Sequence, residues 1–336
     1  MLDEIKFIVC ARTAPVDSCL RALRSNEAAK VRVALRLNRR LPSVLFKLAE
    51  RAKYLEAIGV ERLEATKELA DEYRLRLEEI GRNTRSMLDF ITMSIALIYL
   101  TAAIESVLGI ISSIGVTAAI AMLSVSLALL PLLEQYVRPV RTWDYRLAFL
   151  ASIPALLSYL WPVMAVVGTA IAVIYGRWYF SMIREADEEM VLAMRGRIAV
   201  AKTEVGKAAA EIVRTVKETG ARDLEATAEY LFRLYQTFQE SMRRSSLMRA
   251  AVVAAIYVVL VVALSYLSSI MAPLIQQASQ QGGIPQLPAL QLSNINIRPI
   301  AYLAGVAAMI VAGRMTESYA AVPIYSPLLL SMLFIH

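Results

Sequence analysis

Three long stretches of the chain contain no charged residue at all: 106–133, 147–176 and 250–297. A helix needs about 20 apolar residues to cross about 30 Å of hydrocarbon, and each stretch exceeds that length. Only 19% of the 336 residues are charged and 57% are hydrophobic, whereas soluble domains average about 25% and about 45–50%. The chain is therefore expected to be an all-α membrane protein with several spans, and a purely soluble protein is excluded.

The lengths of the apolar stretches predict how they cross the membrane. As a helix, 147–176 would be about 45 Å long, too long for one upright span, and it contains Pro154 and Pro162. We expect a hairpin that is broken near Trp161-Pro162. The predicted membrane segments, with seven spans in total, are a hairpin in 87–133, a hairpin in 147–176, a single helix in 250–272 and a hairpin in 299–335.

The distribution of Lys and Arg predicts the orientation in the cell membrane. Segment 1–86 holds 18 Lys and Arg, segment 177–249 holds 13, and the loop 134–146 holds three Arg, whereas 273–298 holds a single Arg. Cytoplasmic loops carry the excess of Lys and Arg. The first three segments and the N-terminus are therefore expected in the cytoplasm and 273–298 outside. The net charge of +7 follows from the same bias, so we expect no nucleic-acid partner.

Both charged segments show the periodicity of amphipathic helices, with apolar residues three or four apart. We expect each to form a cytoplasmic helical bundle. The residues concerned are Leu63, Thr66, Leu69, Ala70, Tyr73, Leu77 and Ile80 in the first segment, and Leu224, Thr227, Leu231, Leu234, Phe238 and Met242 in the second.

The two charged segments also match each other. GVERLEATKE (59–68) aligns with GARDLEATAE (220–229) at a constant offset of 161, and nine of the 29 positions from 59 to 87 are identical. Each copy then leads directly into an apolar stretch. Two unrelated amphipathic helices of similar composition could agree by chance, but the contiguous LEAT and the shared preceding glycine favour an internal repeat.

This layout resembles the type II secretion system F family, the membrane platform proteins of type IV pilus-like machines. The residues that carry the resemblance are LPSVLFKLAERAKYLEAIGVERLEATKELADEY (41–73) and AAEIVRTVKETGARDLEATAEYLFRLYQTFQESMRRSSLMR (209–249). The ending is similar to the archaeal branch, in which a Gly-Lys-hydrophobic-Ser/Thr-Glu turn joins the last two spans. Gly313, Thr316 and Glu317 match that turn, and Arg314 replaces the lysine.

The resemblance implies a role and partners. The cytoplasmic bundles would contact a hexameric assembly ATPase, and the membrane part would contact pilin subunits within the lipid bilayer. The protein would be a mechanical coupler of pilus or archaellum assembly, a homodimer rather than an enzyme.

Basic residues of the charged segments are the candidates for docking that ATPase, since they could pair with an acidic patch. A helical face could gather residues three, four and seven apart, such as Arg36, Arg39, Arg40 and Lys47. A solvated face, or contact with anionic lipid headgroups, explains the same cluster. The positive-inside effect alone also explains the basic residues next to the spans. The full set of candidates is Arg36, Arg39, Arg40, Lys47, Arg51, Arg82, Arg243 and Arg244.

Asp89 and Glu105 are the acidic residues expected near the two ends of the first span. A carboxylate in lipid is costly and usually functional, although placement at the membrane interface explains both residues equally well. Neither lies where a proton relay at the bilayer midplane would need it.

The sequence predicts no catalytic, cofactor or metal site. The chain has no phosphate-binding G-x-x-x-x-G-K-[ST] loop, so we expect no catalytic or cofactor site. Cys10 and Cys19 cannot make a disulfide framework, and His336 alone cannot make a histidine-based metal site. The acidic start with its short apolar run is not expected to be a secretory signal peptide.

Two other functions remain open. A secondary transporter places broken helices and polar groups near the bilayer midplane, and the stretch 147–176 is the one candidate for such a site. A membrane sensor with helical signalling segments is the other alternative, for which an internal repeat is less natural.

Overall fold

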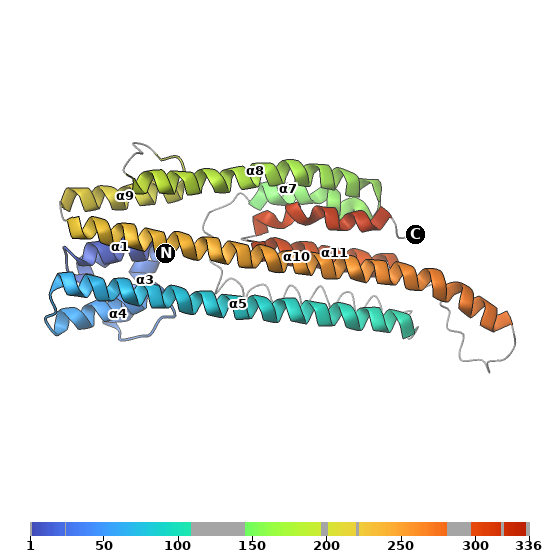
Figure 1. The fold of residues 1–336 in the computed structure, drawn as a ribbon, viewed down its shortest axis with the longest axis horizontal. Coiled ribbons are helices and arrows are strands. Elements are labelled where there is room, and N and C mark those ends of the chain that lie inside the picture. Colours follow the sequence, from blue (N-terminus) through green and yellow to red (C-terminus); the bar gives the residue numbers. More distant parts are fainter. Residues whose placement is uncertain are drawn as a thin grey trace. The chain divides into compact units, whose positions relative to one another are not determined.

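The computed structural model is helical wherever it is described, and no strand occurs in those residues (Figure 1). The described ranges are 2–23, 25–108, 145–195, 201–219, 222–280, 297–316 and 319–333. The all-helical fold expected from the sequence is confirmed for these ranges.

Among the described residues most elements are α-helices, and two are 3₁₀-helices, labelled η. In chain order they are α1 (Leu2–Ala11), α2 (Val16–Ala22), α3 (Asn26–Arg36), α4 (Val44–Ala57), α5 (Arg62–Leu108), α7 (Tyr145–Leu156), η1 (Leu157–Tyr159), α8 (Val163–Met194), α9 (Glu204–Thr219), α10 (Arg222–Gln280), α11 (Ile297–Thr316) and η3 (Tyr319–Leu333).

The chain divides into two compact units. The charged unit combines residues 1–82 with 181–242, and the apolar unit combines 83–180 with 243–336. The long helices α5, α8 and α10 each contribute residues to both units. The sequence suggested one bundle for each charged segment, whereas the structure places both segments in one unit with one hydrophobic core.

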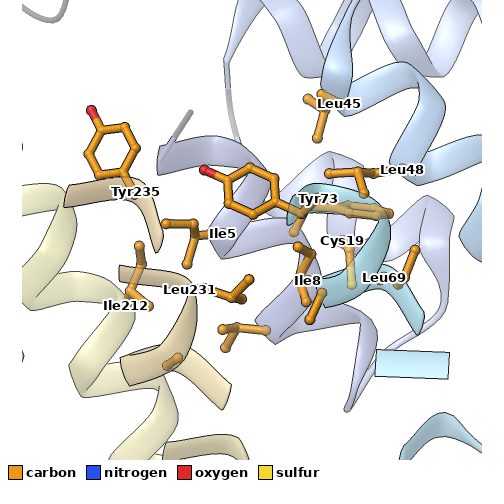
Figure 2. Close-up of a cluster of buried hydrophobic side chains, with 14 of the residues drawn as sticks. Ile5, Ile8, Cys19, Leu45, Leu48, Leu69, Tyr73, Ile212, Leu231 and Tyr235 are labelled. Carbon is orange, nitrogen blue, oxygen red and sulfur yellow. The ribbon is translucent and has the colours of Figure 1, made fainter. Parts of the chain in front are cut away.

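Helix α1 explains why both segments share that core. Ile5, Phe7 and Ile8 are fully buried, although they point in different directions around the helix. Buried side chains on different sides of one helix need neighbours on each of those sides, and α1 packs against both α4 of the first segment and α9 of the second. Figure 2 shows the resulting cluster, in which Ile5 and Ile8 lie among side chains of both segments.

A glycine separates α4 from α5 in the first charged segment. Gly59 has φ +76°, in the left-handed region that glycine adopts without strain. The backbone nitrogen of Val60 donates to the carbonyl of Leu55 at 3.1 Å, and that of Gly59 donates to Glu56 at 3.2 Å. These two bonds form a Schellman motif, which ends α4 and lets α5 begin at Arg62.

The buried faces of the two repeat helices align at an offset of 162, not 161. Thr66, Leu69, Ala70 and Tyr73 are buried on α5, and Ala228, Leu231, Phe232 and Tyr235 are buried on α10. This offset pairs Leu69 with Leu231 and Tyr73 with Tyr235. At 161, Leu69 would instead match Tyr230, which is 39% exposed.

Helix α11 is enclosed on all sides in the apolar unit. Alanines at 301, 304, 307, 308 and 312 are buried, and small side chains let neighbouring helices approach closely. Hydrogen bonds from tyrosine hydroxyls to backbone carbonyls also join α11 to its neighbours. Tyr99 donates to Ala304 at 2.7 Å, Tyr257 donates to Ala301 at 3.1 Å and Tyr302 donates to Leu156 at 2.6 Å.

Helices α11 and η3 form a close antiparallel pair. A methyl group at Gly313 would lie 2.5 Å from the Cα of Val322, and one at Gly305 would lie 2.7 Å from Leu329. The 20 residues of α11 rise about 30 Å at about 1.5 Å each. The 15 residues of η3 also rise about 30 Å, because a 3₁₀-helix rises about 2.0 Å per residue. Each element is thus as long as a hydrocarbon core is thick.

The stretch 147–176 is broken where the sequence suggested. Helix α8 begins at Val163, directly after Trp161-Pro162, and α7 ends at Leu156. The two helices approach closely, since a methyl group at Gly168 would lie 2.9 Å from the backbone nitrogen of Ala155.

Two of the described helical segments are long and apolar enough to cross a membrane, Val163–Met194 and Leu224–Ala263. Ala301–Thr316 and Tyr319–Leu333 are shorter apolar segments. The second span expected in 87–133, most of the loops 134–146 and 273–298, and Glu317 lie outside the described residues.

Candidate functional site

The basic residues of the first segment lie on α3, on α4 and in the connection between these helices. Arg36 is the last residue of α3, and Arg39 and Arg40 follow it. Asn38 adopts φ +52°, and the backbone nitrogen of Arg39 donates to the carbonyl of Ala34 at 2.9 Å, which ends the helix. The prediction was that one helical face carries Arg36, Arg39, Arg40 and Lys47. Because α3 ends at Arg36 and α4 begins at Val44, this prediction is wrong.

Local signals in the sequence could have shown this break. Asparagine tolerates the left-handed conformation, and Asn38 is followed by Pro42 and Ser43. The hydroxyl of Ser43 accepts a hydrogen bond from the backbone nitrogen of Phe46 at 3.1 Å and so caps the start of α4. Asn-Arg-Arg-Leu-Pro-Ser thus stops one helix and starts the next.

Arg40, Lys47 and Arg51 nevertheless line one groove, formed by the α3–α4 connection, α4 and α5. Its volume is about 770 Å³, and apolar side chains, among them Phe46 and Tyr54, line it together with the cations. Arg36 and Arg39 are exposed and do not line the groove. The structure therefore brings together three of the six basic candidates of the first segment.

Ion pairs occupy some of the charges in this groove. Arg51 binds Glu68 at 2.9 Å, and Arg76 binds Glu72 at 2.8 Å and Glu79 at 2.5 Å. The hydrogen bond from Arg76 lowers the pKa of Glu79, and the positive charge of Lys47 contributes in the same direction. Arg40 and Lys47 themselves form no ion pair within the described part of the chain.

The remaining basic candidates lie elsewhere. Arg82 is exposed on the part of α5 that belongs to the charged unit. Arg243, half-buried, and Arg244, exposed, lie on the part of α10 that belongs to the apolar unit. None of the three lines the groove.

Asp89 forms an ion pair between two long helices of the apolar unit. The Nε of Arg249 on α10 donates to Oδ1 of Asp89 on α5 at 2.7 Å. The same guanidinium also donates to the carbonyl of Ser245 at 3.1 Å. Glu105 lies in α5, but its side chain is outside the described residues. Asp89 therefore ties α5 to α10 beside the start of the first predicted span.

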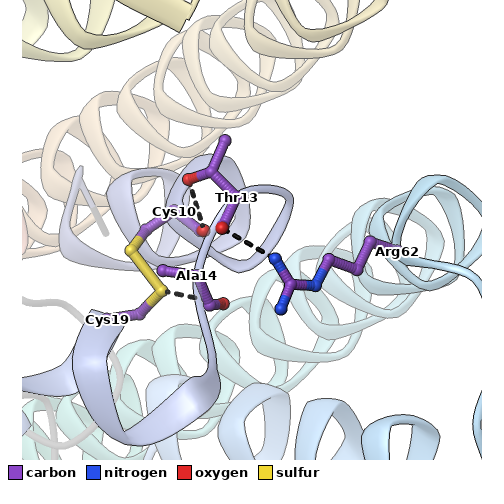
Figure 3. The surroundings of a disulfide bond; sticks show 5 residues. All are labelled: Cys10, Thr13, Ala14, Cys19 and Arg62. Carbon is purple, nitrogen blue, oxygen red and sulfur yellow. Dashed lines mark hydrogen bonds between the residues drawn. A yellow bond between two sulfur atoms is a disulfide. The ribbon is translucent and has the colours of Figure 1, made fainter.

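Sequence reasoning missed a disulfide. Cys10 on α1 and Cys19 on α2 are joined, with their Cα atoms 5.6 Å apart (Figure 3). Arg62, the first residue of α5, donates a hydrogen bond from Nη1 to the carbonyl of Thr13 in the bridged turn at 2.7 Å. The absence of a disulfide framework does not exclude one bridge, and such bridges are uncommon in a reducing cytoplasm, where the sequence places this segment.

No group of three or more His, Cys, Asp and Glu residues could hold a metal ion among the residues described. The groove offers cations beside an aromatic and apolar surface, which is chemistry for binding an acidic partner. Comparison with protein-family models, curated proteins and solved structures finds no match to the chain.

Proposed function

We propose that the chain is a membrane platform protein of a type IV pilus-like or archaellum-like assembly machine. In this role it couples a cytoplasmic hexameric ATPase to the insertion of pilin subunits into a filament. It works as a homodimer and scaffold in the cell membrane, with its charged unit in the cytoplasm. The observation that carries the proposal is the charged unit itself, which two matching segments build together and from which α5 and α10 continue into the apolar unit.

Continuous helices support a mechanical role. Helix α10 spans Arg222–Gln280 without a break, and its sequence contains no glycine, and no proline before Pro273. Sharp kinks in helices arise mainly at proline, at glycine or serine pairs, or at bulges. Before Pro273 the sequence of α10 contains only two serine pairs of this kind, which favours the continuous helix that a mechanical coupler needs.

The surface of the apolar unit supports a place in the bilayer. Large apolar side chains on its long helices are exposed, among them Met93 and Leu97 on α5 and Val258, Val259 and Val262 on α10. Soluble proteins rarely expose contiguous apolar surface of this kind, whereas lipid tails would cover it at no cost. The cytoplasmic orientation of the charged unit follows from the Lys and Arg bias.

Capture of the cognate assembly ATPase by the detergent-solubilised full chain tests the proposal. The wild-type chain is expected to retain the ATPase at low salt. The variant with four substitutions, Arg36→Gln, Arg39→Gln, Arg40→Gln and Lys47→Gln, is expected to bind about fourfold to several-hundred-fold more weakly. This range follows because exposed ion pairs contribute about 0.2–1 kcal/mol each and about 1.4 kcal/mol is tenfold in affinity. The difference should shrink at high salt as screening increases.

A matched control removes four cations elsewhere in the charged unit. Arg74, Arg184, Arg214 and Arg233 are exposed, and each pairs with a glutamate four residues away. Their replacement by glutamine should leave capture unchanged. No capture by the wild-type chain, as a secondary transporter or a sensor would give, contradicts the platform role.

A further inference from the structure

The groove of the charged unit presents a fixed aromatic ring. Tyr54 is 55% exposed, and the guanidinium of Arg51 lies 5.4 Å from the centre of its ring. The same guanidinium also forms an ion pair with Glu68 at 2.9 Å. Arg51 therefore contacts both the Tyr54 ring and a carboxylate. Phe46, which is 5% exposed, lines the same groove. Aromatic surface ordered in this way is typical of the anchor positions of protein interfaces.

The charges of the groove favour an anionic occupant. Glu72 is paired with Arg76, and Arg51 with Glu68. Within the described part of the chain, this leaves Arg40 and Lys47 without an ion pair and Glu50 as the one groove acid without a partner. Two available cations therefore face one available carboxylate.

The size of the groove distinguishes between kinds of anion. A volume of about 770 Å³ is in the range of sites that enclose organic ligands, and an inorganic anion could not use the aromatic surface. A segment of a protein chain supplies both carboxylates and apolar side chains. The combination of cations and aromatic rings therefore selects an acidic peptide.

The helix sets the spacing that such a peptide needs. Lys47 and Tyr54 are seven residues apart on α4, which is about 10 Å along the helix axis. An extended chain rises about 3.3 Å per residue. A carboxylate that pairs with Lys47 and a ring that packs on Tyr54 should therefore lie about three residues apart in the bound segment.

We infer that this groove binds an extended acidic segment of a partner protein, with a carboxylate and an aromatic side chain about three residues apart. The carboxylate pairs with Lys47 and Arg40, and the aromatic ring packs against Tyr54 and Phe46. The inference rests on the proposed function only for the identity of the partner, which would be the assembly ATPase.

Fluorescence anisotropy with the full chain in detergent tests the inference. The probe is a labelled peptide Gly-Asp-Glu-Ser-Gly-Phe-Gly, in which the ring follows the second acid by three residues. Two control peptides replace Phe by Ser, or Asp and Glu by Asn and Gln. The complete peptide should bind at least about fivefold more tightly than either control, because each loses one of two contacts of about 1 kcal/mol.

Variants of the chain locate the peptide. Arg40→Gln with Lys47→Gln should weaken binding about tenfold, and Tyr54→Ala should remove the preference for the Phe peptide. Glu50→Gln should tighten binding about two- to threefold, because it removes the groove's available acid. The control Arg214→Gln with Arg233→Gln takes the same charge from elsewhere in the charged unit and should have no effect.

Equal binding of the peptides with and without Phe would overturn the inference, as would equal loss in the groove variant and the control. The peptide-binding experiment and the ATPase-capture experiment can fail independently of each other. Selective peptide binding without capture of the ATPase would keep the groove and reject the platform role. ATPase capture without selective peptide binding would keep the role and reject the groove.

Discussion

The two matching segments agree best in sequence at an offset of 161 residues, but the residues that this offset pairs differ in burial. Their patterns of burial agree at an offset of 162. LEAT begins at Leu63 in one segment and at Leu224 in the other, yet Leu224 is 1% exposed within the core, whereas Leu63 is half-buried and outside it. Farther along, Leu69 and Tyr73 occupy the same buried face as Leu231 and Tyr235. The offset changes from 161 to 162 between these two stretches.

A single extra residue in the second segment aligns the LEAT stretch and the buried pairs, although the later identities at Glu79, Arg82 and Met87 keep the offset of 161. If Tyr230 is the extra residue, the LEAT stretch aligns before it, and the pairs Leu69/Leu231 and Tyr73/Tyr235 align after it. One residue turns a helix by about 100°, so that residues before the extra one present a different face to the core. Sequence identity and burial thus follow different offsets, because burial depends on what each helix packs against.

The largest effect that tests this alignment comes from the buried leucines. Leu69→Ala and Leu231→Ala should each cost about 2–5 kcal/mol of local stability, the usual cost of removing a buried leucine. Tyr230→Ala, at the position that the 161 frame equates with Leu69, should cost well under 1 kcal/mol because surface substitutions are mild. Amide hydrogen exchange of the charged unit in the full chain measures these costs. Equal costs for Tyr230→Ala and Leu69→Ala would break the alignment.

Reduction of the disulfide tests whether both segments depend on α1. Opening the bridge between Cys10 and Cys19, nine residues apart, should lower stability by about 2–3 kcal/mol, the chain-entropy value for a loop of this length. Because α1 packs against α4 and α9, hydrogen-exchange protection should fall in both helices. The variant Cys10→Ser with Cys19→Ser controls for the reductant, which should not affect it. A response confined to α4 would show that α1 does not join the two segments.

The paired tyrosines should respond differently to loss of their hydroxyl groups. The Tyr73 hydroxyl is buried and has no hydrogen-bond partner among the described residues, so Tyr73→Phe should be neutral or stabilise the unit by up to about 1 kcal/mol. The Tyr235 hydroxyl accepts a hydrogen bond from the Gln239 side chain, so Tyr235→Phe should cost about 0.5–1.5 kcal/mol. The same exchange measurement distinguishes them, and equal effects would contradict the described environments.

The smallest effect appears only at alkaline pH. Burial raises the pKa of Tyr73, and the nearby Glu4 charge and Tyr235 act in the same direction. A raised folded-state pKa contributes stability that is fully present below about pH 10, the unfolded tyrosine value, and is lost as pH rises through the folded-state pKa. Wild-type protection should therefore fall faster above pH 10 than that of Tyr73→Phe. Parallel pH profiles for the two proteins would refute this cause.

Much of the fold could be predicted from the sequence because apolar periodicity and the absence of charge are local signals. These signals indicated the helical stretches 63–80 and 224–242 and the break at Trp161-Pro162. The place of α1 was not predictable in this way. Its short apolar run indicates burial, but only the tertiary structure shows that α4 and α9 cover it. The 3₁₀ geometry of η3 also escaped prediction, although Pro323 and Pro327 lie inside it.

The candidate site was predicted only in part, because local signals in the sequence identify charged residues but not the contacts between distant ones. Charge density indicated Arg40, Lys47 and Arg51, but a helical face was assumed where Asn38 ends α3. The aromatic part of the groove depends on Tyr54, whose role emerges only from its contact with Arg51. The pairing of Asp89 with Arg249 joins residues 160 positions apart, and no local pattern predicts such a contact.

Cross-linking between α1 and α9 tests most directly the central claim that both segments build one unit. Lys6 on α1 and Glu211 on α9 form an ion pair, so a short bismaleimide should join cysteines at these positions in the variant Lys6→Cys with Glu211→Cys. A protease site inserted in the predicted loop 134–146 then separates the two segments on a denaturing gel unless they are cross-linked. The account predicts that the fragments stay joined within one chain, while the single-cysteine controls separate. Complete separation of the double-cysteine variant, or joining only between chains, would contradict the account.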